Sequence, residues 1–232
     1  MVKISEFDSN GKEHLIDGLL MDNDYPQLVN KEKLKSGDVI FCYVDPDNES
    51  SIKDKLKTKA IQKATKGIYV HCGLYIGNNL IADSVNGGVR HENFDTFANN
   101  YDYLVICRCH YLDESHILKM LEYTKACKDK SMKYDMIGAL KVKSVRETHR
   151  KSIHSGDSKP VTIVKEKNKS FCSEFVVNCF KASGYIPWDH KVYISHAFSP
   201  TDLAHDGELL QFEGYISKNG LNTISKSDIF KK

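Results

Sequence analysis

The fold of this chain is limited most strongly by two adjacent stretches of alternating residues, 68–76 and 80–84. Apolar and polar side chains alternate along both, which is typical of β-strands that bury one face. The turn residues Gly77-Asn78-Asn79 separate them, and glycine and asparagine suit the left-handed backbone of a hairpin turn. The two stretches therefore predict an antiparallel hairpin.

The register of this hairpin follows from burial. A three-residue turn pairs Leu74 with Ala82, and the apolar faces of the two strands then match. Ile76 faces Leu80 in the same register. A two-residue turn would instead pair Leu74 with Asp83 and push a carboxylate into the apolar face. We therefore predict the three-residue turn.

This register also brings two ionisable residues together. Asp83 lies opposite Gly73, one diagonal step from His71 on the same face of the sheet. Diagonal neighbours are about 7–8 Å apart at the backbone, which is within reach of their side chains. The hairpin therefore predicts that His71 and Asp83 meet.

A helix is predicted directly behind Cys172. Apolar residues follow this cysteine at helical spacing, with Ser170 or Ser173 as the expected cap and Gly184 near the end. The apolar positions are Phe175, Val176, Cys179 and Phe180. Cys172 then stands at a helix N-terminus, where the helix dipole favours a thiolate. An alternative is a buried structural thiol at the head of a core helix.

Composition sets the class of protein. The 232 residues are 41% hydrophobic and 28% charged, with a formal net charge of +2, which is typical of a soluble globular protein. The sequence contains no apolar run long enough to span a membrane and no Sec-type signal peptide. The seven scattered cysteines favour reduced thiols. We therefore expect a cytoplasmic protein, or one that is exported without such a signal.

The remaining pattern predicts a single domain with an N-terminal arm and a C-terminal tail. The arm is predicted over 1–33, the domain over 34–216 and a loose polar tail over 217–232. Within the domain, the expected elements are a strand near 38–44, a helix over 51–65, a strand over 103–109, a helix over 115–128, a helical turn over 134–140, a long basic loop over 141–169, and extended segments over 188–198 and 209–216.

Two segments are rich in basic residues. The first is 53–66, and the second is 141–169, which holds nine lysines and arginines against three acidic residues. Both fit solvated surfaces. They also fit contact with an anionic surface, either a membrane or a cell-wall polymer. Nothing in the sequence indicates specific nucleic-acid binding.

Several short motifs occur in an order that resembles a known family. They are Leu34-Lys35-Ser36-Gly37-Asp38-Val39-Ile40-Phe41, His71-Cys72-Gly73-Leu74-Tyr75-Ile76-Gly77, Lys133-Tyr134-Asp135, Phe171-Cys172-Ser173-Glu174-Phe175-Val176 and Ser199-Pro200-Thr201-Asp202-Leu203. This set is similar to the circularly permuted branch of the papain-like NlpC superfamily, above all the YaeF/YiiX-like enzymes and more distantly the lecithin:retinol acyltransferase-like ones.

The resemblance implies a fold, a site and a reaction. The fold is α+β and papain-like, with an antiparallel sheet packed against the nucleophile helix. The implied catalytic residues are Cys172, His71 and Asp83, where Asp83 replaces the Glu or His of relatives. The implied reaction is hydrolysis through an acyl-thioester, with peptide or peptidoglycan-type amides as the expected substrates. No cofactor or metal is expected. The residues expected to line the cleft are Tyr134, Asp135 and Tyr75.

Other interpretations stay open. The fold would also suit a lipid acyltransferase or thiol lipase, or a binding module without activity. His91 competes with Asp83 as the residue that orients His71. Cys107-Arg108-Cys109-His110 contains metal-ligand types, but no second ligand pair stands at zinc-site spacing. Cys72 points away from His71 in the predicted strand and is expected in the core.

Overall fold

The computed structural model describes residues 4–7, 13–16, 28–48, 52–65, 67–155 and 168–231. Its centre is a six-stranded sheet in which every neighbouring pair is antiparallel. In spatial order the strands are β10 (Gln211–Ser217), β7 (Tyr103–Arg108), β3 (Val39–Tyr43), β4 (Tyr69–Gly77), β5 (Leu80–Val85) and β6 (Gly88–Asn93). The protein is therefore a mixed α+β fold with an antiparallel sheet.

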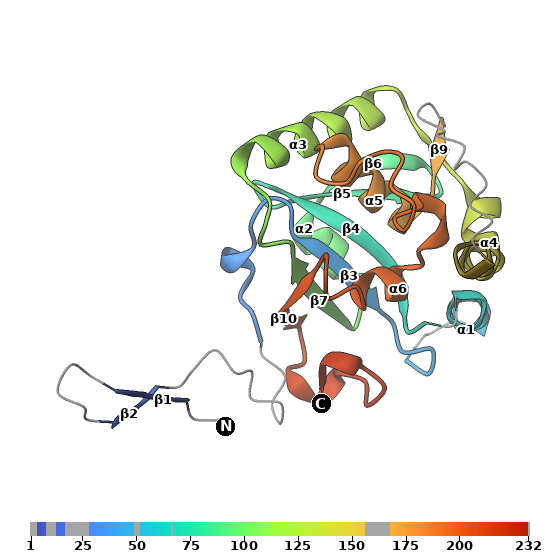
Figure 1. Cartoon of the computed structure of the whole chain (residues 1–232). Coiled ribbons are helices and arrows are strands. Elements are labelled where there is room, and N and C mark those ends of the chain that lie inside the picture. The colour runs from blue at the N-terminus through green and yellow to red at the C-terminus, as the bar shows by residue number, and fades with distance from the viewer. Residues whose placement is uncertain are drawn as a thin grey trace.

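Helices cover both faces of this sheet (Figure 1). On one face, α3 (Glu114–Asp129) and α5 (Cys172–Ala182) pack on the larger core, and α2 (Phe94–Ala98) packs on a smaller core on the other face. The neighbouring helices are α1 (Ile52–Thr65), α4 (Met136–Ser155) and α6 (Pro200–Ala204). Among the described residues, no helix is long and apolar enough to cross a membrane.

The shorter elements connect these layers. The strands β8 (Lys133–Tyr134) and β9 (Lys169–Ser170) pair in parallel beside α4 and α5. In the predicted arm, β1 (Ile4–Phe7) pairs with β2 (Glu13–Ile16). Four 3₁₀ turns complete the described chain: η1 (Lys31–Lys33), η2 (Ser195–Ala197), η3 (Leu221–Thr223) and η4 (Ile229–Lys231).

The predicted hairpin is present, but its turn differs. Leu74 pairs with Ala82 as expected, whereas Gly77, rather than Ile76, pairs with Leu80. A bulge between Tyr75 and Gly77 absorbs one residue, so a two-residue turn still matches the apolar faces. The turn residues are Asn78 and Asn79, with φ of 51° and 58°. The prediction of a three-residue turn was wrong because it did not allow for a bulge.

The basic segment 141–169 is helical over much of its length. Helix α4 runs from Met136 to Ser155, where a helical turn followed by a loop was predicted, and 156–167 lie outside the described residues. Val142 is buried on its inner face. One and two helical turns further on, Arg146 and His149 continue that face in place of apolar residues, so the apolar stripe is too short to predict the helix.

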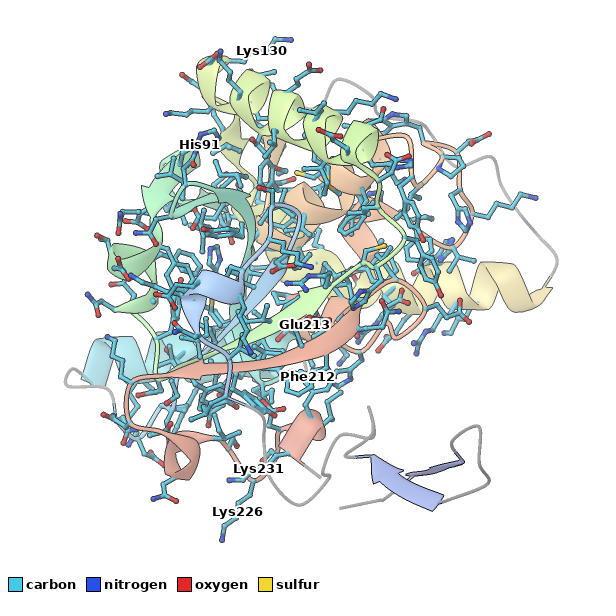
Figure 2. The ribbon with its side chains drawn as sticks, turned by 90° about the vertical axis from the view of Figure 1, so that its left-hand side faces the viewer. His91, Lys130, Phe212, Glu213, Lys226 and Lys231 are labelled. Atoms are coloured by element: carbon cyan, nitrogen blue, oxygen red, sulfur yellow. The ribbon has the colours of Figure 1, made fainter. Side chains whose placement is uncertain are left out.

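The C-terminal segment packs on the domain instead of forming a loose tail. Asp228 and Ile224 are buried, and the Phe230 ring stacks on Phe212 of β10 with centroids 4.5 Å apart. Figure 2 shows Lys226 and Lys231 of this segment beside β10. Upstream, the segment 188–198 contains only the η2 turn and no strand, so the extended segment predicted there is replaced by turns.

Candidate functional site

Cys172 is the first residue of α5, as the helical spacing predicted. The cap differs from the prediction, because Phe171 is the N-cap and its N–H donates to the Glu174 carboxylate at 3.4 Å. The two serines proposed as caps serve elsewhere: Ser173 donates to the carbonyl of Phe198 and Ser170 contacts the sulfur of Met132. The thiol therefore stands at a helix N-terminus whose dipole favours its ionised form.

The first half of β4 is where this helix meets the sheet. Strand pairing between β4 and β5 runs from the turn only as far as Leu74 and Ala82. Beyond that point, the backbone N–H of Cys72 and its thiol both hydrogen-bond to the Cys172 sulfur. Cys72 is buried in the core as expected, but it also contacts the candidate nucleophile, which the sequence did not indicate.

His71 joins the thiol to a carboxylate. Its Nε2 lies 2.8 Å from Oδ2 of Asp83, and its ring also hydrogen-bonds to Cys172. Asp83 is fully buried, and the His71 side chain is 12% exposed. The rings of Phe97 and Tyr101 lie 6.0 and 6.3 Å from the His71 ring and hold it in place. The structure thus brings together the three residues that the sequence nominated.

The Cys172 thiol is strongly acidified. The hydrogen bond from the Cys72 thiol favours the thiolate, burial opposes it, and the charge and hydrogen bond of His71 favour it again. The balance holds the pKa of Cys172 well below its ordinary value. Because only a thiolate is a strong nucleophile, this environment fits covalent chemistry at Cys172.

His71 is the matching cation. Burial by itself would lower its pKa, but the Cys172 thiolate and the hydrogen bond to Asp83 outweigh burial and raise the pKa to about 10. Burial likewise opposes ionisation of Asp83, but hydrogen bonds from His71 and Arg90 keep the pKa of this carboxyl below its usual value. The three groups therefore form a thiolate, an imidazolium and a carboxylate.

Arg90 is a residue of the candidate site that the sequence did not indicate. It faces Asp83 across the β5–β6 pair, and its Nε donates to Oδ1 of Asp83 at 3.0 Å. The turn between these strands is Asn86-Gly87, with Val85 paired to Gly88. Asn-Gly between two strands is a strong signal for a two-residue hairpin loop, and counting back from that loop would have paired Arg90 with Asp83.

A narrow pocket of about 70 Å³ opens beside Cys172. Tyr134, one of the predicted cleft residues, lines it together with apolar side chains of α1, α4 and β4. These apolar residues include Ile61, Val70, Leu140 and Val142. Burial raises the pKa of Tyr134, so its hydroxyl keeps its proton and is available as a hydrogen-bond donor in the pocket.

Two other predicted cleft residues lie elsewhere. Asp135 starts α4, because its Oδ1 accepts the N–H of Gly138 at 3.0 Å and contacts Lys169. Tyr75 stands four residues along β4 from His71, about 13 Å at the strand rise, and its hydroxyl accepts the N–H of Asn79. Neither lines the pocket beside Cys172.

The structure also bears on two alternatives that the sequence left open. His91 pairs with Ala82 in the sheet, next to the Asp83–Arg90 pair, so its side chain is on the opposite face from Asp83. It lines a surface depression with α3 residues such as Lys128. The strand residue Arg108 binds Asp38 and Glu213. Within the described ranges, no group of three or more histidines, cysteines or acidic residues is placed to hold a metal.

Comparison of the chain with models of known protein families and with curated proteins finds no match in either set.

Proposed function

We propose that this protein is a cysteine hydrolase that forms an acyl-thioester on Cys172, on a papain-like fold of the circularly permuted NlpC type. The observation that carries the proposal is the position of His71, which contacts both the Cys172 sulfur and the Asp83 carboxylate. A nucleophile, a base and a group that orients the base are the minimum for this chemistry. The antiparallel sheet packed against α5 supports the fold assignment.

The first half of the reaction uses the ion pair. The Cys172 thiolate attacks the acyl carbonyl carbon, and the carbonyl oxygen becomes an oxyanion. The backbone N–H of Cys172 is a donor for that oxyanion, since first-turn N–H groups have no partner within a helix. The bond to the leaving group then breaks, and the His71 imidazolium gives its proton to the departing amine or alcohol.

The second half regenerates the thiolate. Neutral His71 takes a proton from water, and the resulting hydroxide attacks the thioester carbonyl. The carbon–sulfur bond breaks, so the acid product leaves and Cys172 returns to the thiolate opposite His71 imidazolium. Asp83 accepts the hydrogen bond from His71 Nε2 throughout, which leaves Nδ1 for the side of the ring that meets sulfur.

The family resemblance favours amides of the peptide or peptidoglycan type as the substrate. A second candidate, an acyl ester of a lipid, is favoured by the apolar pocket beside Cys172. Leu140 of that pocket is 65% exposed, and Met136 and Ile137 on the same helix are also exposed. Clustered exposed apolar residues are often functional, and Leu140 connects this cluster to the pocket beside Cys172.

The deciding experiment offers the purified protein both kinds of substrate. Peptidoglycan-derived peptides and phospholipid vesicles are incubated separately with the native protein and with C172A and C172S. We expect acid release by the native protein alone, with an acyl adduct on Cys172 visible by mass spectrometry. Cleavage of peptides supports the amide, and release of fatty acid supports the lipid ester. Equal activity in C172A would refute the nucleophile.

A binding module without activity predicts a different result. In that case iodoacetamide at neutral pH would label Cys172 no faster than the other six cysteines, all of which are buried. Preferential labelling of Cys172 therefore separates an enzyme from a binding module before any substrate is known.

A further inference from the structure

We propose that Arg90 is a positioning residue for this site, which acts on the Cys172–His71 pair through Asp83. The inference rests on the proposed function and adds to it a fourth residue, supplied by a third strand. His71, Asp83 and Arg90 come from β4, β5 and β6 in spatial order. The sheet therefore carries a continuous line of alternating charge that ends at the thiol.

The contact has the geometry of a fork. Arg90 Nε donates to Asp83 Oδ1 at 3.0 Å, and Nη2 donates to Oδ2 at 3.3 Å. Oδ2 also faces His71 Nε2 at 2.8 Å. A guanidinium that grips both oxygens fixes the plane of the carboxylate, and the plane of Asp83 in turn sets the direction in which the His71 ring is held.

A permanent cation is needed at this position. Asp83 is fully buried, and an isolated buried carboxylate takes up a proton rather than stay charged. His71 carries charge during only part of the proposed cycle, because it gives its proton to the leaving group. Arginine keeps its charge at all relevant pH values. Arg90 therefore keeps Asp83 ionised while His71 is neutral.

Arg90 also forms an ion pair with Glu92. Its guanidinium contacts Glu92 at 2.7 Å, and its side chain is 40% exposed. The ionisable groups around Asp83 come from several elements: His71 and Cys72 on β4, Cys42 on β3, Arg90 and His91 on β6, and Tyr101 after α2. Glu92 and Cys172 lie one contact further out, on Arg90 and His71. Of these, Arg90 alone carries a positive charge that does not titrate in the working range.

The test is the pH dependence of Cys172 alkylation by iodoacetamide, read by mass spectrometry in the native protein, R90Q and R90K. Loss of the Arg90 charge weakens Asp83 as the anion that supports His71 imidazolium. A weaker imidazolium raises the pKa of Cys172, so the lower limb of the profile should move to higher pH. For R90Q we expect a shift of about one unit, or about tenfold in rate on that limb.

R90K keeps the charge and replaces the fork by a single ammonium, so we expect a smaller shift in the same direction. R108Q is the matched control. Arg108 grips buried Asp38 with the same fork, at 2.6 and 2.8 Å, but contacts no residue of the site. It should lower the melting temperature and leave the profile of Cys172 unchanged.

The outcomes separate the two proposals. If native Cys172 is alkylated no faster than the other cysteines, the proposed function fails. If native Cys172 is reactive and R90Q keeps the native lower limb, with or without a lower melting temperature, the role of Arg90 is overturned. Should R90Q not fold, R90K is measured in its place, and a native profile in R90K overturns the positioning of Asp83 by the fork.

Discussion

Two of the buried aspartates in this chain are held in opposite ways. Asp83 is bound by His71 and Arg90, whereas Asp228 accepts hydrogen bonds from the hydroxyls of three tyrosines at 2.8 to 2.9 Å. These are Tyr69, Tyr103 and Tyr215, all fully or almost fully buried. The partners of Asp83 are cations that reach solvent, with Arg90 40% exposed, while the partners of Asp228 are neutral and sealed.

This difference separates chemistry from stability. A carboxylate beside an imidazole can support a proton transfer, because the imidazole changes its charge near neutral pH. Burial, followed by the charge of Asp228, raises the pKa of each of the three tyrosines, so none of them exchanges a proton in that range. The tyrosine cluster instead ties the C-terminal segment to β4, β7 and β10.

The largest expected contrast concerns two thiols. In the site that contains Asp83, the pKa of Cys172 is held low. Near Asp228, by contrast, burial and then the negative charge of Asp228 raise the pKa of Cys107. At pH 6 an ordinary thiol is ionised to about 0.3%. Iodoacetamide should therefore alkylate Cys172 on the order of 100-fold faster in the native protein than in denaturant, and Cys107 more slowly in the native protein.

The pH window of this contrast has two limits. Because the pKa of Cys172 is lowered in the folded protein, ionised Cys172 stabilises the fold at high pH, and this stabilisation is lost as pH falls through the lowered pKa. The pKa of His71 is raised from 6.5 to about 10. The stabilisation from charged His71 is therefore complete below about pH 6.5 and is lost as pH rises through about 10. Turnover should follow the same upper limit, while alkylation continues above it. An upper limb near 7 would contradict the ion pair.

The second prediction weakens the tyrosine cluster. D228N replaces one oxygen by an NH₂ group, and each oxygen of Asp228 accepts two hydrogen bonds. A buried donor without an acceptor costs about 1–3 kcal/mol, so the free energy of unfolding should fall by about 3 kcal/mol. Urea unfolding measures it. Alkylation of Cys172 per folded molecule should stay at the native rate, and a slower rate would show that the two regions are coupled.

The parts of the site that could be predicted are those encoded by residues close together in the sequence. Alternation over 68–84 predicted the contact of His71 with Asp83, and helical spacing predicted the position of Cys172. Both signals are local. The bulge at Ile76 left no mark in the alternation, and Arg90 was missed because the Asn86-Gly87 turn was not used to set the register of β6.

The least predictable parts depend on contacts between distant segments. Asp228 lies 159 residues from Tyr69, and the polar sequence around it is typical of a loose tail. On the inner face of α4, the apolar residue Val142 is followed one turn later by Arg146, which forms an ion pair with Asp202 of α6. A helix face completed by an ion pair has no apolar period to detect, so the basic composition of this segment favoured a loop.

The third prediction concerns D83N, which removes the charge of Asp83. D83N should slow alkylation of Cys172 at neutral pH by at least about tenfold, or about 1.4 kcal/mol, because His71 loses its anionic partner. Its stability should fall less than that of D228N, since Arg90 is already partly solvated and keeps Glu92 as a partner. Denaturant unfolding of both variants gives this ranking, and a larger loss for D83N would reverse the comparison.

The smallest expected effect comes from a single hydroxyl in the sealed cluster. Y215F deletes one hydrogen bond to Oδ1 of Asp228 and leaves that oxygen the N–H of Phe230. One hydrogen bond to a charged group contributes about 1.5–3 kcal/mol at most, and the remaining acceptor contact reduces the expected loss to about 1 kcal/mol. Y111F, at a tyrosine that is 69% exposed, is the control and should change stability by less than about 0.5 kcal/mol. If both variants unfold at the same urea concentration, the hydroxyl of Tyr215 contributes no net stability, and the cluster is held by packing of its rings alone.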